Sequence, residues 1–290
     1  MSEQGSANGA RLPRKIDWVG ATPFILIHFL ALGAIWTGVT PAAAICCAVL
    51  YFVRMFAVTG AYHRYFSHRT YKTSRAFQFV LAFLAQSSAQ RGVLWWAGHH
   101  RHHHRWSDQR EDLHSVAQDG FWYSHVLWIF ERDNQVTDYN RIRDFARFPE
   151  LRFLDRFHLI PPVIMGTVVF LTLGAPGLFF GFFVSTVLLW HGTFTINSIS
   201  HVFGNRRFTT TDHSRNSWWL AIITLGEGWH NNHHRYAGSA RQGFFWWEID
   251  VSYYLLKMLS WMGLIWDLKA VPPSVYREAA QLKQSAPPGV

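Results

Sequence analysis

The chain has 290 residues, which is enough for one large domain or two small ones. Hydrophobic residues make up 49% of it and aromatic residues 17%, yet its mean hydropathy is 0.00. Soluble enzymes rarely contain 15 Trp and 24 Phe, and a plain bundle of membrane helices would be more apolar, so the composition predicts a chain divided between lipid and water. The net charge of +9 is typical of nucleic-acid binding or of a cytoplasmic membrane face, and the apolar segments favour the lipid bilayer over nucleic acid.

Residues 1–17 are polar and are expected to form an N-terminal tail. Four apolar stretches after this tail are predicted to cross the bilayer. They span residues 18–36, 41–60, 159–173 and 178–199. Short turns at 37–40 and 174–177 join them in pairs, so the sequence predicts two helical hairpins. Arg54 is the only Lys, Arg, Asp or Glu inside these stretches, and it could snorkel toward the nearer interface.

The distribution of Lys and Arg predicts the orientation. Both turns lack them, whereas the segments before, between and after the hairpins are rich in them. Because positive residues favour the cytoplasm, both termini, the long middle segment and the active site are predicted to be cytoplasmic. Two further apolar stretches, 77–85 and 244–266, are too short or too interrupted by charge to cross, and are predicted to be amphipathic helices in the interface.

The fold class expected is therefore an all-α, multi-pass integral membrane protein. It has four transmembrane helices, interfacial helices and a cytoplasmic, His-rich helical domain. A single domain over residues 18–277 and a polar C-terminal tail over 278–290 complete this interpretation.

The 17 His residues are the most unusual feature of the chain, and many fall in one H-x-x-x-x-H box and two H-x-x-H-H boxes. In order, the boxes contain His63 and His68; His100, His103 and His104; and His230, His233 and His234. Positions i, i+3 and i+4 of a helix share a face, so three imidazoles of an H-x-x-H-H box can converge. His63 and His68 are five residues apart and off a common face, so they either serve different metals or one of them follows a helix end.

A ninth candidate, His201, lies one helical turn after Asn197 at the end of the fourth crossing. One tetrahedral zinc needs only three or four ligands, so two metals fit nine imidazoles better. Imidazole suits Zn, Cu, Fe and Ni, and the ligand type alone does not select iron. The two cysteines, Cys46 and Cys47, are adjacent in an apolar run, which excludes a disulfide framework and an iron–sulfur cluster.

These motifs resemble the integral-membrane fatty-acyl desaturases, and most of all the stearoyl-CoA (Δ9) desaturase branch. The resemblance covers about residues 63–267 and includes the three boxes in order, the motif Asn197-Ser-x-x-His201 and the Gly-Glu-Gly at 226–228. It implies O₂-dependent desaturation of a fatty-acyl chain to a cis-monoene, with two iron ions (Fe²⁺/Fe³⁺) as the cofactor. Removing hydrogen from an unactivated methylene is beyond side-chain acid–base chemistry, which agrees with a metal cofactor.

The resemblance also implies the site residues, and it assigns no catalytic residue beyond the metal ligands. The implied ligands are His63, His68, His100, His103, His104, His201, His230, His233 and His234, with Asn197 reaching a metal through a water. The second box has another possible register, His99-x-x-His102-His103, but Trp96 stands four residues before His100, as in the family. Glu227, Asp108 and Asp112 could orient imidazoles from behind, or form surface ion pairs instead.

In the same branch the acyl chain occupies a bent tunnel, and the resemblance assigns its bend to Gln90, Trp96 and Thr193. One departure concerns the acyl carrier. Animal acyl-CoA enzymes carry basic residues for the CoA phosphates where this chain has Glu131-Arg132-Asp133. An acyl chain on a membrane lipid therefore competes with fatty-acyl-CoA as the substrate.

The two electrons per turnover need a separate carrier, because the sequence contains no ferredoxin, flavin or haem pattern. Cytochrome b5, ferredoxin or rubredoxin, with its reductase, is expected to bind the basic face. A hydroxylase or ketolase of the same superfamily is the nearest alternative function. A non-enzymatic membrane metal-binding protein or transporter would be expected to place ionisable groups at mid-membrane. Only Arg54, His28 and His191 are candidates there, and they have no acidic partner.

Overall fold

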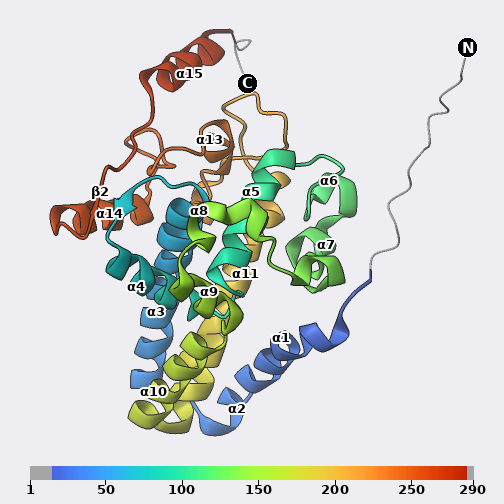
Figure 1. The fold of residues 1–290 in the computed structure, drawn as a ribbon, viewed down its shortest axis with the longest axis vertical. Coiled ribbons are helices and arrows are strands. Elements are labelled where there is room, and N and C mark those ends of the chain that lie inside the picture. The colour runs from blue at the N-terminus through green and yellow to red at the C-terminus, as the bar shows by residue number, and fades with distance from the viewer. Residues whose placement is uncertain (1–14, 286–290) are drawn as a thin grey trace, which may run out of the picture.

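The structure is a computed structural model that describes residues 15–285. Helices form almost all of its regular structure, and the only strands in this part of the chain are β1 (Lys72–Thr73) and β2 (Ile265–Trp266), which pair antiparallel. Long helices occupy one half of the molecule, and short helices and loops occupy the other half (Figure 1). The predicted helical class is confirmed for the described residues.

The first membrane region begins at Trp18. It consists of α1 (Trp18–Ala31), the short α2 (Ala34–Thr37), α3 (Pro41–Phe56) and a π-helix, η1 (Ala57–Ser67), that continues α3 directly. Asp17 caps α1 by accepting a hydrogen bond from the Gly20 N–H, and Thr40 caps α3 in the same way. Residues 18–37 and 41–67 are each long and apolar enough to cross a membrane.

The second membrane region reverses direction in its middle. It consists of α10 (Ile160–Pro176), a π-helix, η5 (Gly177–Val184), and α11 (Ser185–Asn197). Gly174 has a φ of +64°, which residues with a side chain rarely adopt, and the helix breaks there. A Cβ on Gly166 would lie 3.2 Å from the Phe182 ring, whereas a continuous helix would hold these two positions about 24 Å apart. The apolar stretch 160–201 is thus a hairpin, and it is the third stretch able to cross a membrane.

Arg54 connects the two membrane regions. Its side chain in α3 is fully buried, so it does not snorkel to the interface as the sequence suggested. The guanidinium donates hydrogen bonds to the hydroxyls of Ser185 and Thr186 on α11 and contacts the carbonyl of Ser87. These oxygens accept hydrogen bonds from the guanidinium inside the bundle, so the Arg54 side chain does not need to reach water.

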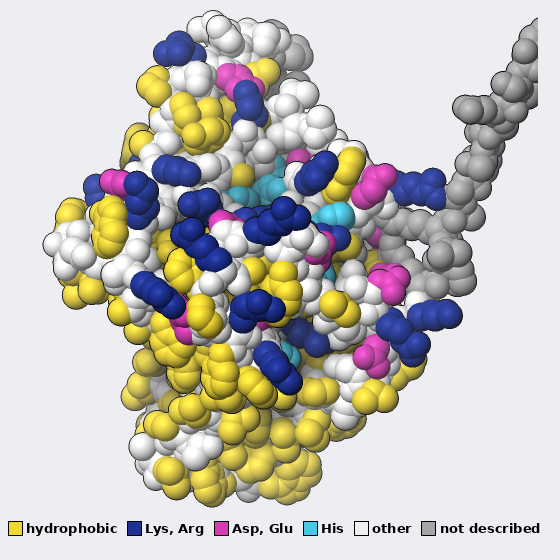
Figure 2. All heavy atoms as spheres, in the orientation of Figure 1, with side chains coloured by type: hydrophobic (Ala, Val, Ile, Leu, Met, Phe, Trp, Pro, Cys, Tyr) yellow, Lys and Arg dark blue, Asp and Glu magenta, His cyan; other side chains and the backbone are white. Residues whose placement is uncertain are grey.

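Two apolar helices outside these regions are too short to cross, as predicted: α4 (Arg75–Gln86) and α14 (Val251–Trp261). Large apolar side chains beside them are exposed, including Trp246 and Trp261, at 81% and 76% of their surface. Hydrophobic side chains cover the half of the molecule that contains the long helices, and most Lys and Arg lie on the other half (Figure 2). This separation is the one expected of a chain shared between lipid and water.

Short helices make up most of the rest. They are α5 (Val93–Trp106), α6 (Val116–Asp119), α7 (Phe121–His125), η2 (Leu127–Phe130), η3 (Arg132–Gln135), η4 (Tyr139–Ile142), α8 (Arg143–Ala146), α9 (Pro149–Arg156), η6 (Ile199–His201), α12 (Trp218–Ile223) and α13 (His230–Arg235). The main hydrophobic core lies between η1, α4, α5 and α9, and includes Phe66, Leu94 and Leu151. This core holds α5 against η1, and so brings the first and second His boxes together.

The C-terminal part differs from the expected polar tail over 278–290. Residues 273–285 form a helix, α15 (Pro273–Ser285). Val275 and Ala279 are buried in a small core with Phe244, and Glu278 forms an ion pair with Arg235. An apolar stripe three to four residues apart therefore holds this segment on the domain. Residues 1–14 of the predicted N-terminal tail and residues 286–290 lie outside the described part.

Candidate metal centre

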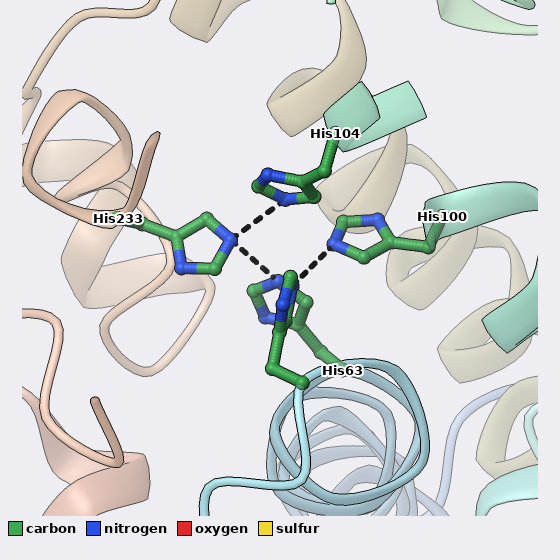
Figure 3. Close-up of side chains that lie close together, drawn as sticks. His63, His100, His104 and His233 are labelled. Carbon is green, nitrogen blue, oxygen red and sulfur yellow. Dashed lines mark hydrogen bonds between the residues drawn. The ribbon is translucent and has the colours of Figure 1, made fainter. Parts of the chain in front are cut away.

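The nine histidines expected as ligands lie in two buried clusters, and within each cluster the nearest ring nitrogens are within 4.8 Å of one another. One cluster contains His63, His68, His100, His104 and His233, and the other contains His103, His201, His230 and His234. Figure 3 shows four imidazoles of the first cluster pointing toward a common centre from three separate elements. We call them the five-His cluster and the four-His cluster.

Each H-x-x-H-H box is divided between the two clusters. On α5, His100 and His104 face the five-His cluster, whereas His103 faces the four-His cluster. On α13, the division is reversed: His233 faces the five-His cluster and His230 the four-His cluster, together with His234. The simple expectation that three imidazoles of a box converge on one point is therefore wrong, because a ring one position along the helix points about 100° away.

The register of the second box follows from the same geometry. His99 and His102 lie outside both clusters. His99 is buried on another face of α5, and its Nδ1 lies 2.8 Å from the Trp95 carbonyl. His102 lies near the surface, and its Nε2 is 2.8 Å from the Glu111 carbonyl.

The five-residue spacing of the first box is accommodated by the π-helix η1. His63 and His68 both belong to the five-His cluster, and the His68 N–H donates to the His63 carbonyl, a bond from i+5 to i. A π-helix has more residues per turn than an α-helix, so positions five apart come close to one face. His68 directly follows the end of this helix at Ser67, which was one of the two alternatives proposed.

Four of the nine imidazoles have a carboxylate on Nδ1. The pairs are His63–Glu227 at 2.5 Å, His103–Asp112 at 2.9 Å, His201–Asp108 at 3.0 Å and His234–Asp212 at 2.8 Å. A hydrogen bond from Nδ1–H to a carboxylate fixes the tautomer whose Nε2 lone pair is free to face the cluster. In this tautomer Nε2 can bind a metal. Three of these acids were predicted, but Asp212 was not, because it lies far from every box.

Burial favours neutral imidazoles over most of the site. His103 is the exception, because the charge and hydrogen bond of Asp112 outweigh burial and raise its pKa. Burial lowers the pKa of His100 and His104 far below the usual value, and the neighbouring histidines lower it further. Burial alone would raise the pKa of Asp112, but the charge and hydrogen bond of His103 outweigh it and lower the pKa. The same balance with His234 lowers the pKa of Asp212.

The donor set fits metal ions. Ring nitrogens of different histidines face one another without a carbonyl or carboxylate between them, as for His63 and His233 (Nε2–Nε2 3.0 Å) and His201 and His230 (3.1 Å). The Nε2 of His234 is buried without any hydrogen-bond partner. Buried polar atoms without partners are rare, and converging lone pairs are suited to a cation. No thiolate lies near, so the set favours Zn, Cu, Fe or Ni.

An apolar cavity of about 290 Å³ reaches His100 and Asn197 from the membrane side. Gln90, Trp96 and Thr193, the three residues expected at a tunnel bend, line it. The Gln90 amide donates to the Thr193 hydroxyl at 3.1 Å, and the Trp96 ring stacks on His100. These three side chains lie where the cavity meets the imidazoles.

A second, smaller pocket of about 40 Å³ continues past this point. It shares Trp96, His100, Thr193 and Asn197 with the first cavity, and also reaches His63 and His230. Its lining includes the apolar Met55 and Val58 of the first membrane region, and also the polar Glu227. An extended apolar molecule in the two spaces would therefore pass beside residues of both clusters.

Comparisons with known proteins agree with this geometry. The fatty acid desaturase family model matches residues 38–266. The chain is 35% identical over 263 residues to the sn-2 palmitoyl-lipid 9-desaturase of Nostoc sp. (strain 36), covering 89% of this chain and 92% of that protein. It is 34% identical to Delta-9 acyl-lipid desaturase 1 of Arabidopsis thaliana (98% and 93% covered). It is also 33% identical to the acyl-CoA C20 Delta5-desaturase of Anemone leveillei (89% and 83% covered). Because the family model matches most of this chain and the relatives align over most of their own length, the chain belongs to the fatty acid desaturase family.

Proposed function

We propose that this desaturase introduces a cis double bond, at the Δ9 position, into a fatty-acyl chain carried by a membrane lipid, with two irons in its His clusters. One observation carries the proposal: an apolar cavity ends against imidazoles of two clusters, in which four of the nine rings have a carboxylate on Nδ1. A chain of methylenes fits such a cavity, and a surface metal site would have no use for it.

The five-His cluster would hold one iron and the four-His cluster the other, with Asn197 near the second through a water. Bound iron would supply the oxidation of an unactivated C–H bond, in which O₂, two electrons and two protons are consumed and two waters are released for each double bond. Imidazoles supply these ligands as neutral groups, and Glu227 is the one backing carboxylate that lines the smaller pocket. The acids stand one layer behind, where they fix the ring tautomers.

The side chains of the cavity have a separate task. The Gln90–Thr193 hydrogen bond and the Trp96 ring would shape the bend that brings two neighbouring CH₂ groups close to the metals. An apolar, enclosed wall excludes water and competing reactions. Positioning of this kind, rather than proton transfer by a side chain, is the expected contribution of the protein.

For the arrangement in the bilayer we propose four crossings, with the clusters and both termini on the cytoplasmic side. The hairpin at Gly174 supports this number, because it divides the stretch 160–201 into two antiparallel helices. The turns at 37–40 and 174–177 contain no Lys or Arg, which supports the orientation.

The acyl carrier is proposed to be a membrane lipid. Acyl-CoA is the alternative carrier of the same fatty-acyl chain. The names of the Nostoc and Arabidopsis relatives specify acyl lipids, whereas the Anemone relative is named for acyl-CoA. The two acids at 131 and 133 also disfavour a highly anionic nucleotide carrier at that point of the surface. A separate one-electron carrier, either cytochrome b5 or a ferredoxin or rubredoxin, would dock on the basic face.

Expression in a host with saturated membrane lipids, followed by chromatography of each lipid class and of the acyl-CoA pool, tests the proposal. Monoenes that appear first in the glycerolipids are expected, with two irons per purified chain. Monoenes that appear first in acyl-CoA would change the carrier, and hydroxylated products would support the hydroxylase alternative. A protein with one zinc or with no metal, and no new product, would contradict the function.

The matched variants are His103→Ala, in the four-His cluster, and His102→Ala, its surface neighbour on α5. We expect His103→Ala to abolish the product while the protein remains in the membrane, and His102→Ala to leave the product unchanged. Equal activity of the two variants would remove His103 from the metal centre.

A further inference from the structure

Three histidines outside the clusters form a hydrogen-bonded chain across three helices. The Nε2 atoms of His28 on α1 and His191 on α11 are 3.1 Å apart, and the His191 Nδ1 lies 3.1 Å from the Nε2 of His125 on α7. The chain ends at the Ser198 hydroxyl, 2.9 Å from the His125 Nδ1. None of these residues has a part in the metal centre described above.

The direction of this chain is determined by its end in α1. The His28 Nδ1 is 2.8 Å from the Phe24 carbonyl, which can only accept, so this nitrogen carries the hydrogen. A neutral His28 must then accept at Nε2 from the Nε2–H of His191. His191 in turn accepts at Nδ1 from the Nε2–H of His125. The Nδ1 of His125 faces the Ser198 hydroxyl, which also lies 3.0 Å from the Phe194 carbonyl. One neutral tautomer of each ring thus satisfies both hydrogen bonds between the three histidines.

The chain lies directly behind an aromatic wall of the acyl cavity. Phe24, Trp190 and Phe194 line that cavity. The His28 ring centre is 4.3 Å from that of Phe24, and the His191 and His125 ring centres are 5.9 Å and 5.7 Å from that of Phe194. A change in the position of these imidazoles would therefore move the wall that the acyl chain contacts.

Helix α1 has few other polar contacts that could determine its rotation. Its Phe24 ring stacks on Trp190 at 4.9 Å, and the backbone just before the helix pairs with residues 130–132. Its face with Gly20, Pro23, Phe24 and Ile27 lines the cavity, and its only buried residue is Ala21. In lipid, apolar helices are not driven together by the hydrophobic effect, so polar contacts and close packing decide how they are rotated. Among residues 15–285, His28–His191 is the only side-chain hydrogen bond from α1 to another helix.

We propose that His28, His191 and His125 are positioning residues that set the rotation of α1, and so decide how tightly the acyl chain is held and which of its carbons reach the metals. This inference rests on the proposed function, because it assumes that the cavity holds an acyl chain. It assigns to three membrane-side histidines a part in specificity that needs no metal ligation.

The test uses His28→Leu, His191→Leu and the double variant in the full-length protein. Binding of a radiolabelled saturated acyl lipid, without O₂ or reductant, is expected to weaken about three- to fifteenfold, the range for a lost interhelical hydrogen bond. The double variant should bind about as weakly as His191→Leu, because that variant already lacks the bonds of His191 to both His28 and His125. The fraction of double bonds at secondary positions should rise, with the metal content unchanged.

His191→Gln and Leu26→Ala are the controls. Gln keeps one donor and one acceptor and should restore most of the binding, and Leu26 is exposed on the lipid side of α1, so its truncation should change nothing. Leucine variants with wild-type affinity and products would overturn the inference. Leucine variants that lose bound metal or fail to accumulate would also overturn it, since the three histidines would then be required for the whole fold. A wild-type protein that neither binds nor desaturates acyl chains would instead defeat the proposed function.

Discussion

The two His clusters differ in what stands behind their imidazoles. In the four-His cluster, three of the four rings have an ionised carboxylate on Nδ1, from Asp108, Asp112 and Asp212. In the five-His cluster, only His63 has one, from Glu227. One cluster therefore relies on fewer, more basic ligands with nearby negative charge, and the other on a larger number of ligands. Under the proposed function, these are two physical routes to holding a metal ion.

The largest expected effect comes from removing a ligand of the smaller cluster. His201→Ala would leave three imidazoles there, whereas His68→Ala would leave four in the other cluster. We expect His201→Ala to lower the iron content from two to one per chain, and to reduce desaturation by more than the roughly hundredfold that losing a backing group can cost. His68→Ala should retain more iron, as measured by elemental analysis. Equal losses would break the comparison.

The next effect comes from a carboxylate of the four-His cluster. Asp212→Asn removes the charge behind His234 and should weaken metal binding about 10- to 100-fold. Competition with a chelator measures this affinity. Asp133→Asn, which changes an exposed acid away from the clusters, is the matched control and should leave the affinity unchanged. An identical result for the two variants would show that the carboxylate does not tune its ligand.

Glu227→Gln should have a smaller effect, about tenfold, because four other imidazoles of the five-His cluster do not depend on Glu227. The buried Arg64 would keep its ion pair with Asp250 and its bond to the Ala240 carbonyl, so the protein should still fold. The same chelator competition applies. A larger loss of metal affinity than for Asp212→Asn would show that the five-His cluster, and not the four-His cluster, depends more on its carboxylate.

The smallest effect is expected at the cavity, which neither cluster needs for binding metal. Thr193→Ala removes the acceptor of the Gln90 amide, and should change acyl-chain affinity about two- to tenfold and shift the distribution of products. The iron content should stay at two. An unchanged product distribution would argue against a tunnel bend at this residue.

Much of this arrangement could be predicted from the sequence, because helices keep local spacing. The hairpin turn around Gly174 and the membership of each box are local properties, and both are found in the structure. What could not be predicted were long-range or conformational features. Asp212 reaches His234 only through the fold, and η1 is a π-helix although nothing in its composition distinguishes it from an α-helix.

The sequence by itself determined which residues could bind metal, how many there are and which stretches are apolar enough for lipid. Only the tertiary structure decided how each H-x-x-H-H box is divided between two centres, which acids stand behind which rings, and that Arg54 is buried against hydroxyls of α11. The physical reason is that spacing along a helix sets the angle between side chains, but a shared centre also requires the crossing of separate helices, and that depends on packing across the whole core.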